Sequence, residues 1–129
     1  MATIMVVDDY AVTQRMLTYQ LFKQGHQVVT ANNGHEALNS LRDLEIDLMI
    51  VDLAMPEMDG LTVLRQLRAS SRYRSLPIIM LTASGKEQDR KQAMNAGVNA
   101  FLTKPTVAWQ LVDVVSNLLE HPHTLAVAA

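Results

Sequence analysis

Five short apolar segments alternate with stretches of helical periodicity along this chain. The apolar segments span residues 4–7, 27–31, 47–51, 77–81 and 100–103. Residues 48–51 and 78–81 are apolar throughout, whereas a strand with one face in solvent alternates polar with apolar positions. Both faces of these strands are therefore predicted to be buried, as in a parallel sheet that helices cover on two sides.

Helical patterns fill the gaps between the apolar segments. In the last of them the apolar residues form a stripe over three turns, at Val107, Leu111, Val114, Val115 and Leu118. Two further signatures place a capping side chain three residues before a glutamate, from Asn33 to Glu36 and from Ser84 to Glu87. Each signature predicts the start of a helix.

Five strand–helix units in succession predict an α/β fold. The expected architecture is a doubly wound, five-stranded parallel sheet with right-handed crossovers and five helices on its two faces. No linker, repeat or low-complexity stretch interrupts the pattern, so we expect one domain over residues 1–120. Residues 121–129 carry no pattern and are expected to form a poorly ordered C-terminal tail.

The composition supports a globular domain and excludes several classes of protein. Hydrophobic residues make up 49% of the chain and the net charge is −2, so disorder is not expected and charge favours no partner class. The chain has no cysteine, which excludes a disulfide framework, a thiolate metal site and thiol catalysis. No leader is recognisable, and no apolar run approaches the roughly 20 residues that span a bilayer. We expect a cytoplasmic protein with no membrane partner.

Charged and polar residues follow the apolar segments. Asp8 and Asp9 follow the first and Asp52 follows the third, while Thr82 and Lys104 follow the fourth and fifth. Ligands of parallel sheets bind beyond the carboxyl ends of the strands. Three carboxylates, one hydroxyl and one ammonium are therefore expected in a single cleft.

This group of side chains favours the chemistry of phosphoryl groups. Neighbouring carboxylates repel one another, and a hard divalent cation such as Mg²⁺ relieves that repulsion. Lys104 can hold one phosphoryl oxygen as a point charge and Thr82 can donate a hydrogen bond to another. Asp52, in the middle, is a candidate nucleophile toward phosphorus.

Four segments together resemble the receiver domain of two-component response regulators. They are residues 6–9, 52–60, 81–83 and 97–105, and the resemblance extends from about residue 3 to residue 119. It implies a flavodoxin-like sheet with strand order 2-1-3-4-5. It also implies Mg²⁺-dependent phosphorylation of Asp52, with Mn²⁺ as an alternative ion, by a histidine kinase or a histidine phosphotransfer protein. Such a domain is no enzyme beyond catalysing its own phosphorylation and dephosphorylation.

The same resemblance implies how the cation is held. By position, Asp9 and Asp52 would bind the metal directly, Asp8 would act through water, and Ala54 would supply its backbone carbonyl. Lys104 would pair with the phosphoryl group, and the Lys104–Pro105 peptide would be cis.

The resemblance also implies a switch. Thr82 would move toward the phosphoryl group and Phe101 would turn inward behind it, altering the surface over residues 86–119 for a downstream partner whose identity stays open. Ala54 and Ser84 occupy positions that are expected to tune the lifetime of the phosphoryl group. This coupling is plausible physically because phosphorylation adds about 1.5 to 2 negative charges and new acceptor oxygens.

Three other functions are alternatives for a chain with this pattern. An electron-transfer protein that binds FMN would need a Ser/Thr/Gly-rich loop where this chain has Asp8 and Asp9. A phosphohydrolase with an aspartyl nucleophile usually has a second acid two residues later, where this chain has Ala54. A docking module that needs no phosphorylation would not require the intact cleft. In plainer interpretations, the two acids cap the first helix and Lys104 is a solvated lysine.

Features outside the cleft leave the partners open. Arginines at positions 65, 68, 72 and 74 are expected to form a solvated face rather than a nucleic-acid contact, because the net charge is negative. Trp109 begins the last helix and is open to either partner contact or partial burial. The last helix lacks the charge pattern of receivers that dimerise through it, so we expect a monomer or a weak dimer. The chain is expected to be a stand-alone regulator or a receiver excised from a longer protein.

Overall fold

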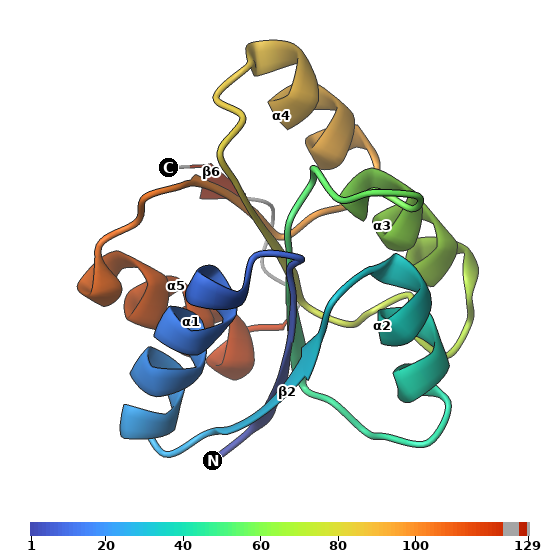
Figure 1. Ribbon diagram of the computed structural model, residues 1–129. Coiled ribbons are helices and arrows are strands. Elements are labelled where there is room, and N and C mark those ends of the chain that lie inside the picture. Colours follow the sequence, from blue (N-terminus) through green and yellow to red (C-terminus); the bar gives the residue numbers. More distant parts are fainter. Residues whose placement is uncertain (123–126, 129) are drawn as a thin grey trace.

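The computed structural model describes residues 1–122, 127 and 128 and shows five strand–helix units in the predicted order (Figure 1). The elements are β1 (Thr3–Val7), α1 (Ala11–Lys23), β2 (Gln27–Ala31), α2 (Gly34–Leu41), β3 (Leu48–Val51), α3 (Gly60–Ala69), β4 (Ile78–Thr82), α4 (Glu87–Asn95), β5 (Ala100–Thr103), α5 (Ala108–Glu120) and β6 (Val127–Ala128).

All strands pair in parallel, in the order β2-β1-β3-β4-β5-β6. The five predicted strands and their order are confirmed. The sixth, a two-residue strand that pairs with β5, was not predicted, because two residues are too few to show a periodicity. Residues 123–126 and 129 of the predicted tail lie outside the described residues.

The strands distribute alternate side chains to two helical layers, as successive strand residues must. In β1, Met5 and Val7 pack into a core with α2, α3 and α4, whereas Ile4 and Val6 pack into a second core with α1 and α5. Figure 1 shows α1 and α5 on one side of the sheet and the other three helices opposite. Burial on both faces explains why β3 and residues 78–81 of β4 are apolar throughout.

The two capping signatures have different outcomes. Asn33 caps α2, and its side chain accepts a hydrogen bond from the backbone N–H of Glu36, as predicted. The prediction for Ser84 was wrong: α4 has Lys86 at its N-cap and no side-chain cap, and the Ser84 hydroxyl donates to the carboxylate of Asp89 instead.

Candidate functional site

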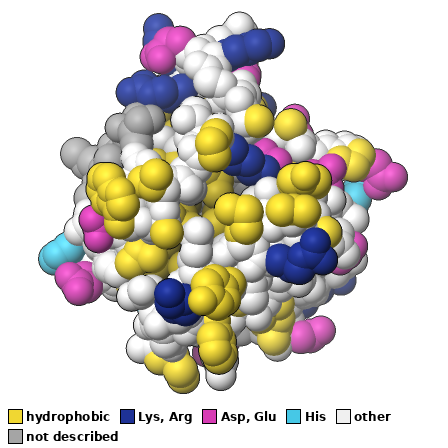
Figure 2. Space-filling model, turned by 60° about the vertical axis from the view of Figure 1, so that its left-hand side comes forward, with side chains coloured by type: hydrophobic (Ala, Val, Ile, Leu, Met, Phe, Trp, Pro, Cys, Tyr) yellow, Lys and Arg dark blue, Asp and Glu magenta, His cyan; other side chains and the backbone are white. Residues whose placement is uncertain are grey.

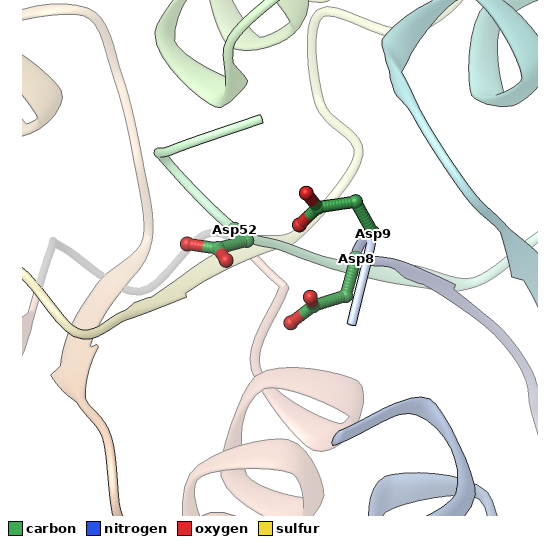
Figure 3. A group of neighbouring side chains, drawn as sticks. All are labelled: Asp8, Asp9 and Asp52. Carbon is green, nitrogen blue, oxygen red and sulfur yellow. The ribbon is translucent and has the colours of Figure 1, made fainter. Parts of the chain in front are cut away.

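Backbone pairing brings the three predicted aspartates together at one edge of the sheet. β1 and β3 are neighbours, and their ladder continues past the strands, because the N–H of Asp52 donates to the carbonyl of Val7 at 3.0 Å. One carboxylate oxygen from each of Asp8, Asp9 and Asp52 lies within 4.8 Å of the others. Figure 3 shows the three side chains converging from the ends of these two strands. Such a set of hard oxygen donors suits a divalent cation of the Mg²⁺ type.

Lys104 joins two of these carboxylates. Its Nζ lies 2.7 Å from Oδ2 of Asp8 and 3.0 Å from Oδ2 of Asp52. Burial lowers the pKa of Lys104, but hydrogen bonds and charge attraction from the two carboxylates outweigh it, so the pKa is raised overall. The ammonium therefore stays charged beside the acids. The Lys104–Pro105 peptide is cis, which confirms that prediction.

Backbone amides hold the remaining oxygens of the two buried acids. Asp8 is 2% exposed and its Oδ1 accepts the N–H of Tyr10 at 2.9 Å. Asp52 is 7% exposed and its Oδ1 accepts the N–H of Ala54 at 3.3 Å. The N-cap of α1 is Tyr10, without a side-chain cap, so the interpretation of Asp8 and Asp9 as mere helix caps was wrong. Asp9 itself is exposed.

Thr82 is the last residue of β4, and Ser84 lies in the turn that follows. Thr82 is buried, and its hydroxyl oxygen accepts the N–H of Ser84 at 3.3 Å. Phe101 is 2% exposed and belongs to the core that packs against α2, α3 and α4. A further inward turn of this ring therefore has almost no surface left to bury, and its role as a switch stays a prediction.

Two residues at this edge of the sheet were given no role in the site from the sequence. The side-chain amide of Gln14, on α1, donates to the carbonyl oxygen of Asp8 and, at 2.9 Å, to Oδ1 of Asn32. A single polar residue on a helix carries no sequence signal, since most such residues face solvent. Gly60 packs directly against the backbone of Asp52. A Cβ at position 60 would lie 2.2 Å from the carbonyl oxygen of Asp52.

Arg68, which was predicted to lie on a solvated face, forms hydrogen bonds within the domain instead. Arg68 donates to the carbonyl oxygens of Gly97, Tyr73 and Leu76 and to Oδ1 of Asn99, so its assignment to a solvated basic face was wrong. Burial lowers the pKa of Arg68.

Large exposed apolar side chains concentrate on α1 and at the start of α5. They include Val12, Met16, Tyr19, Phe22, Val107 and Trp109. Figure 2 turns this side of the molecule forward and shows hydrophobic side chains gathered on it. Trp109 is 69% exposed, so the alternative of a partly buried ring is wrong, and contact with a partner stays a prediction. Within the described residues, no helix is long and apolar enough to cross a membrane.

Comparison with known proteins assigns the family. The response regulator receiver domain matches residues 4–116, a span that contains all the site residues described above. The chain belongs to this family. Receiver domains are signalling modules of two-component systems rather than enzymes with a separate substrate, and acceptance of a phosphoryl group by an aspartate agrees with the acidic cluster at the sheet edge.

Relatives of known name match this receiver domain over nearly its whole length. The chain is 35% identical to the sensory/regulatory protein RpfC of Xanthomonas campestris over 98% of this chain and 18% of RpfC. It is 39% identical to the transcriptional regulatory protein ResD of Bacillus subtilis over 90% of this chain and 47% of ResD. The chain thus spans less than half of either protein.

A solved structure agrees in fold. The chemotaxis protein CheY4 of Vibrio cholerae superposes with a TM-score of 0.85 at 30% identity, covering 91% of this chain and 98% of CheY4. The receiver fold and the predicted family are therefore both confirmed.

Proposed function

We propose that residues 1–120 form a receiver domain in which Asp52 accepts a phosphoryl group from a histidine kinase or a histidine phosphotransfer protein. The observation that carries this proposal is the bridge from Lys104 to Asp8 and Asp52 inside a cluster of three carboxylates. It sets a fixed positive charge beside the proposed acceptor, where a phosphoryl group would bring negative charge.

The acidic cluster would hold one Mg²⁺, or Mn²⁺ in its place. Asp9, Asp52 and the backbone carbonyl of Ala54 are the proposed direct ligands, and Asp8 would act through water. Three carboxylate oxygens within 4.8 Å of one another support this assignment, because the single charge of Lys104 does not offset the repulsion among three carboxylates. The bound ion would supply positive charge that offsets the charge on the phosphoryl oxygens.

The transfer step balances without a further reactant. A carboxylate oxygen of Asp52 attacks phosphorus, so that an O–P bond forms while the N–P bond of the donor phosphohistidine breaks and its electron pair stays on the imidazole nitrogen. Lys104, already 3.0 Å from Asp52, neutralises an oxygen of the transferred group. Hydrolysis of the acyl phosphate by water reverses the signal, and the domain would catalyse these two reactions only.

The proposed response extends from Thr82, at the end of β4, to the surface formed by α4, β5 and α5. Thr82 would donate its hydroxyl to the phosphoryl group, exchanging its present contact with the N–H of Ser84, and Phe101 would couple that movement to the α4–β5–α5 surface. Small side chains at Ala54 and Ser84 would leave water a path to the acyl phosphate. A downstream protein, rather than a nucleic acid, would bind the altered surface, in the cytoplasm, with the domain as a monomer or weak dimer.

Labelling with a small phosphodonor tests the proposal. Incubation of the wild-type chain with acetyl phosphate and MgCl₂ should add one phosphoryl group, visible by mass spectrometry, that alkali and hydroxylamine both remove, as expected of an acyl phosphate. Asp52→Asn should abolish it, because the amide is no nucleophile toward phosphorus, while Asp43→Asn, at an exposed acid outside the cluster, should leave it intact. Equal labelling of wild type and Asp52→Asn, or no labelling of wild type, overturns the proposal.

A further inference from the structure

The side-chain amide of Gln14 lies where the ends of β1 and β2 meet. Its Nε2 donates to the carbonyl oxygen of Asp8 and lies 2.9 Å from Oδ1 of Asn32 and 3.3 Å from the carbonyl oxygen of Ala31. An amide nitrogen carries two hydrogens, so the two shorter contacts, with Asp8 and Asn32, use both of them. Gln14 therefore ties the end of β1 to the turn after β2.

The contact with Asp8 bears on the acid that follows it. The carbonyl of Asp8 and the N–H of Asp9 belong to one planar peptide unit, so holding that carbonyl orients the backbone from which Asp9 starts. The carboxylate of Asp8 has its own partners in Lys104 and the N–H of Tyr10. Asp9 is exposed, so this peptide unit fixes the point and direction from which its side chain leaves the backbone.

The other end of the connection is anchored too. The backbone N–H and the side-chain amide of Asn32 each donate to Oε1 of Glu36 at 3.3 Å. Glu36 also belongs to the capping pair with Asn33 that begins α2. Through Asn32, the Gln14 amide thus links the acid-bearing loop to the first turn of a helix rather than to a freely rotating side chain.

We propose that Gln14 is a positioning residue for the cation site: it fixes the Asp8–Asp9 peptide so that the carboxylate of Asp9 meets that of Asp52, without itself touching the ion. This inference rests on the proposed function, which places a divalent cation among these acids. Residues that orient metal ligands typically change metal affinity 10- to 100-fold when mutated. Because Gln14 acts on a single ligand through one peptide, the expected change is at the lower end, about tenfold.

Calorimetric titration of the full chain with MgCl₂ tests this role. Gln14→Met keeps the length of the side chain and removes both donors, and it should raise the dissociation constant for Mg²⁺ about tenfold. Gln20→Met is the matched control on the same helix, where Gln20 lines an apolar pocket with Met16 and Leu17, and it should bind Mg²⁺ as the wild type does. With acetyl phosphate, Gln14→Met should need more Mg²⁺ for half-maximal labelling but reach the wild-type rate at saturation.

Urea unfolding separates positioning from stability. A purely structural role would lower the urea midpoint of Gln14→Met and leave the Mg²⁺ affinity of the folded protein unchanged. Asn32→Ala, at an exposed position, removes the anchor and should weaken Mg²⁺ binding less than Gln14→Met. The double variant should be no weaker than Gln14→Met alone, because both act on one connection.

The outcomes distinguish the two proposals. If the wild type, Gln14→Met and Asn32→Ala all bind Mg²⁺ with the same affinity, the role of Gln14 is overturned and the proposed function stands. If the wild type binds no Mg²⁺, the proposed cation site fails and the role of Gln14 fails with it. Should Gln14→Met not fold, Asn32→Ala decides alone: wild-type affinity in that variant overturns the positioning role.

Discussion

Gly60, the first residue of α3, has no room for a side chain. A Cβ at this position would lie 2.2 Å from the carbonyl oxygen of Asp52, 2.9 Å from its carbonyl carbon and 3.0 Å from Cα of Leu53. These are backbone atoms, and the N–H of Gly60 donates to the carbonyl of Leu53 at 2.9 Å. No side-chain rotation relieves such contacts, so Gly60→Ala must displace the segment that carries Asp52.

The expected loss of stability follows from this geometry. Overpacking a close-packed interior costs about 1–3 kcal/mol, and the upper end applies here because backbone has to move. Urea slopes of small domains are about 2 kcal/mol/M, so a loss of about 3 kcal/mol lowers the urea midpoint by about 1.5 M. Labelling of the folded variant by acetyl phosphate should also be slower, since the displaced segment bears the proposed acceptor.

Gly85→Ala provides the matched control. A Cβ at Gly85 meets nothing within 4 Å, and this glycine is not among those with positive φ. Replacing glycine at a compatible site stabilises by about 0.4–1 kcal/mol through the unfolded state, so its midpoint should stay or rise slightly. Circular dichroism in urea measures both variants. A Gly60→Ala protein with the wild-type midpoint would refute the reasoning.

Two further predictions concern residues away from the acids. Arg68→Lys should lose about 2 kcal/mol in urea unfolding, because an ammonium cannot serve the four acceptors that the guanidinium reaches; an unchanged midpoint would contradict this. Burial and the nearby N-terminal amino group lower the pKa of His26, whose Nδ1 accepts the N–H of Ala2. Its contribution to stability is therefore complete above the ordinary pKa of 6.5 and is lost as the pH falls below it. His26→Gln should flatten that part of the stability profile, and parallel profiles would count against the assignment.

The two capping signatures illustrate the reach of local patterns. Asn33 and Glu36 satisfy each other, as their spacing predicted. Ser84 and Glu87 have the same spacing, yet the Ser84 hydroxyl donates to Asp89. A hydroxyl in a turn has several acceptors within reach, and a three-residue pattern does not rank them. Helix α4 consequently begins without the predicted side-chain cap.

Part of the candidate site could be predicted from the sequence pattern alone. Burial on both faces of a strand leaves an unbroken apolar run, as in β3 and in residues 78–81 of β4. Such runs locate the strand ends that Asp8, Asp52 and Lys104 follow. Parallel pairing then requires those ends to share one edge of the sheet. The fold class and the convergence of these charges are therefore properties of the one-dimensional pattern.

The contacts among those charges depend on the folded chain. Lys104 reaches Asp8 across 96 residues and Asp52 across 52, and no local pattern encodes which oxygens an ammonium will bridge. Gln14 and Gly60 begin or lie on helices, and their importance comes from residues that follow β1, β2 and β3. Those residues approach the helices only when the sheet and its helices pack together. A side chain's partners are set by packing in three dimensions, whereas its place in a strand or helix follows from its immediate neighbours in the chain.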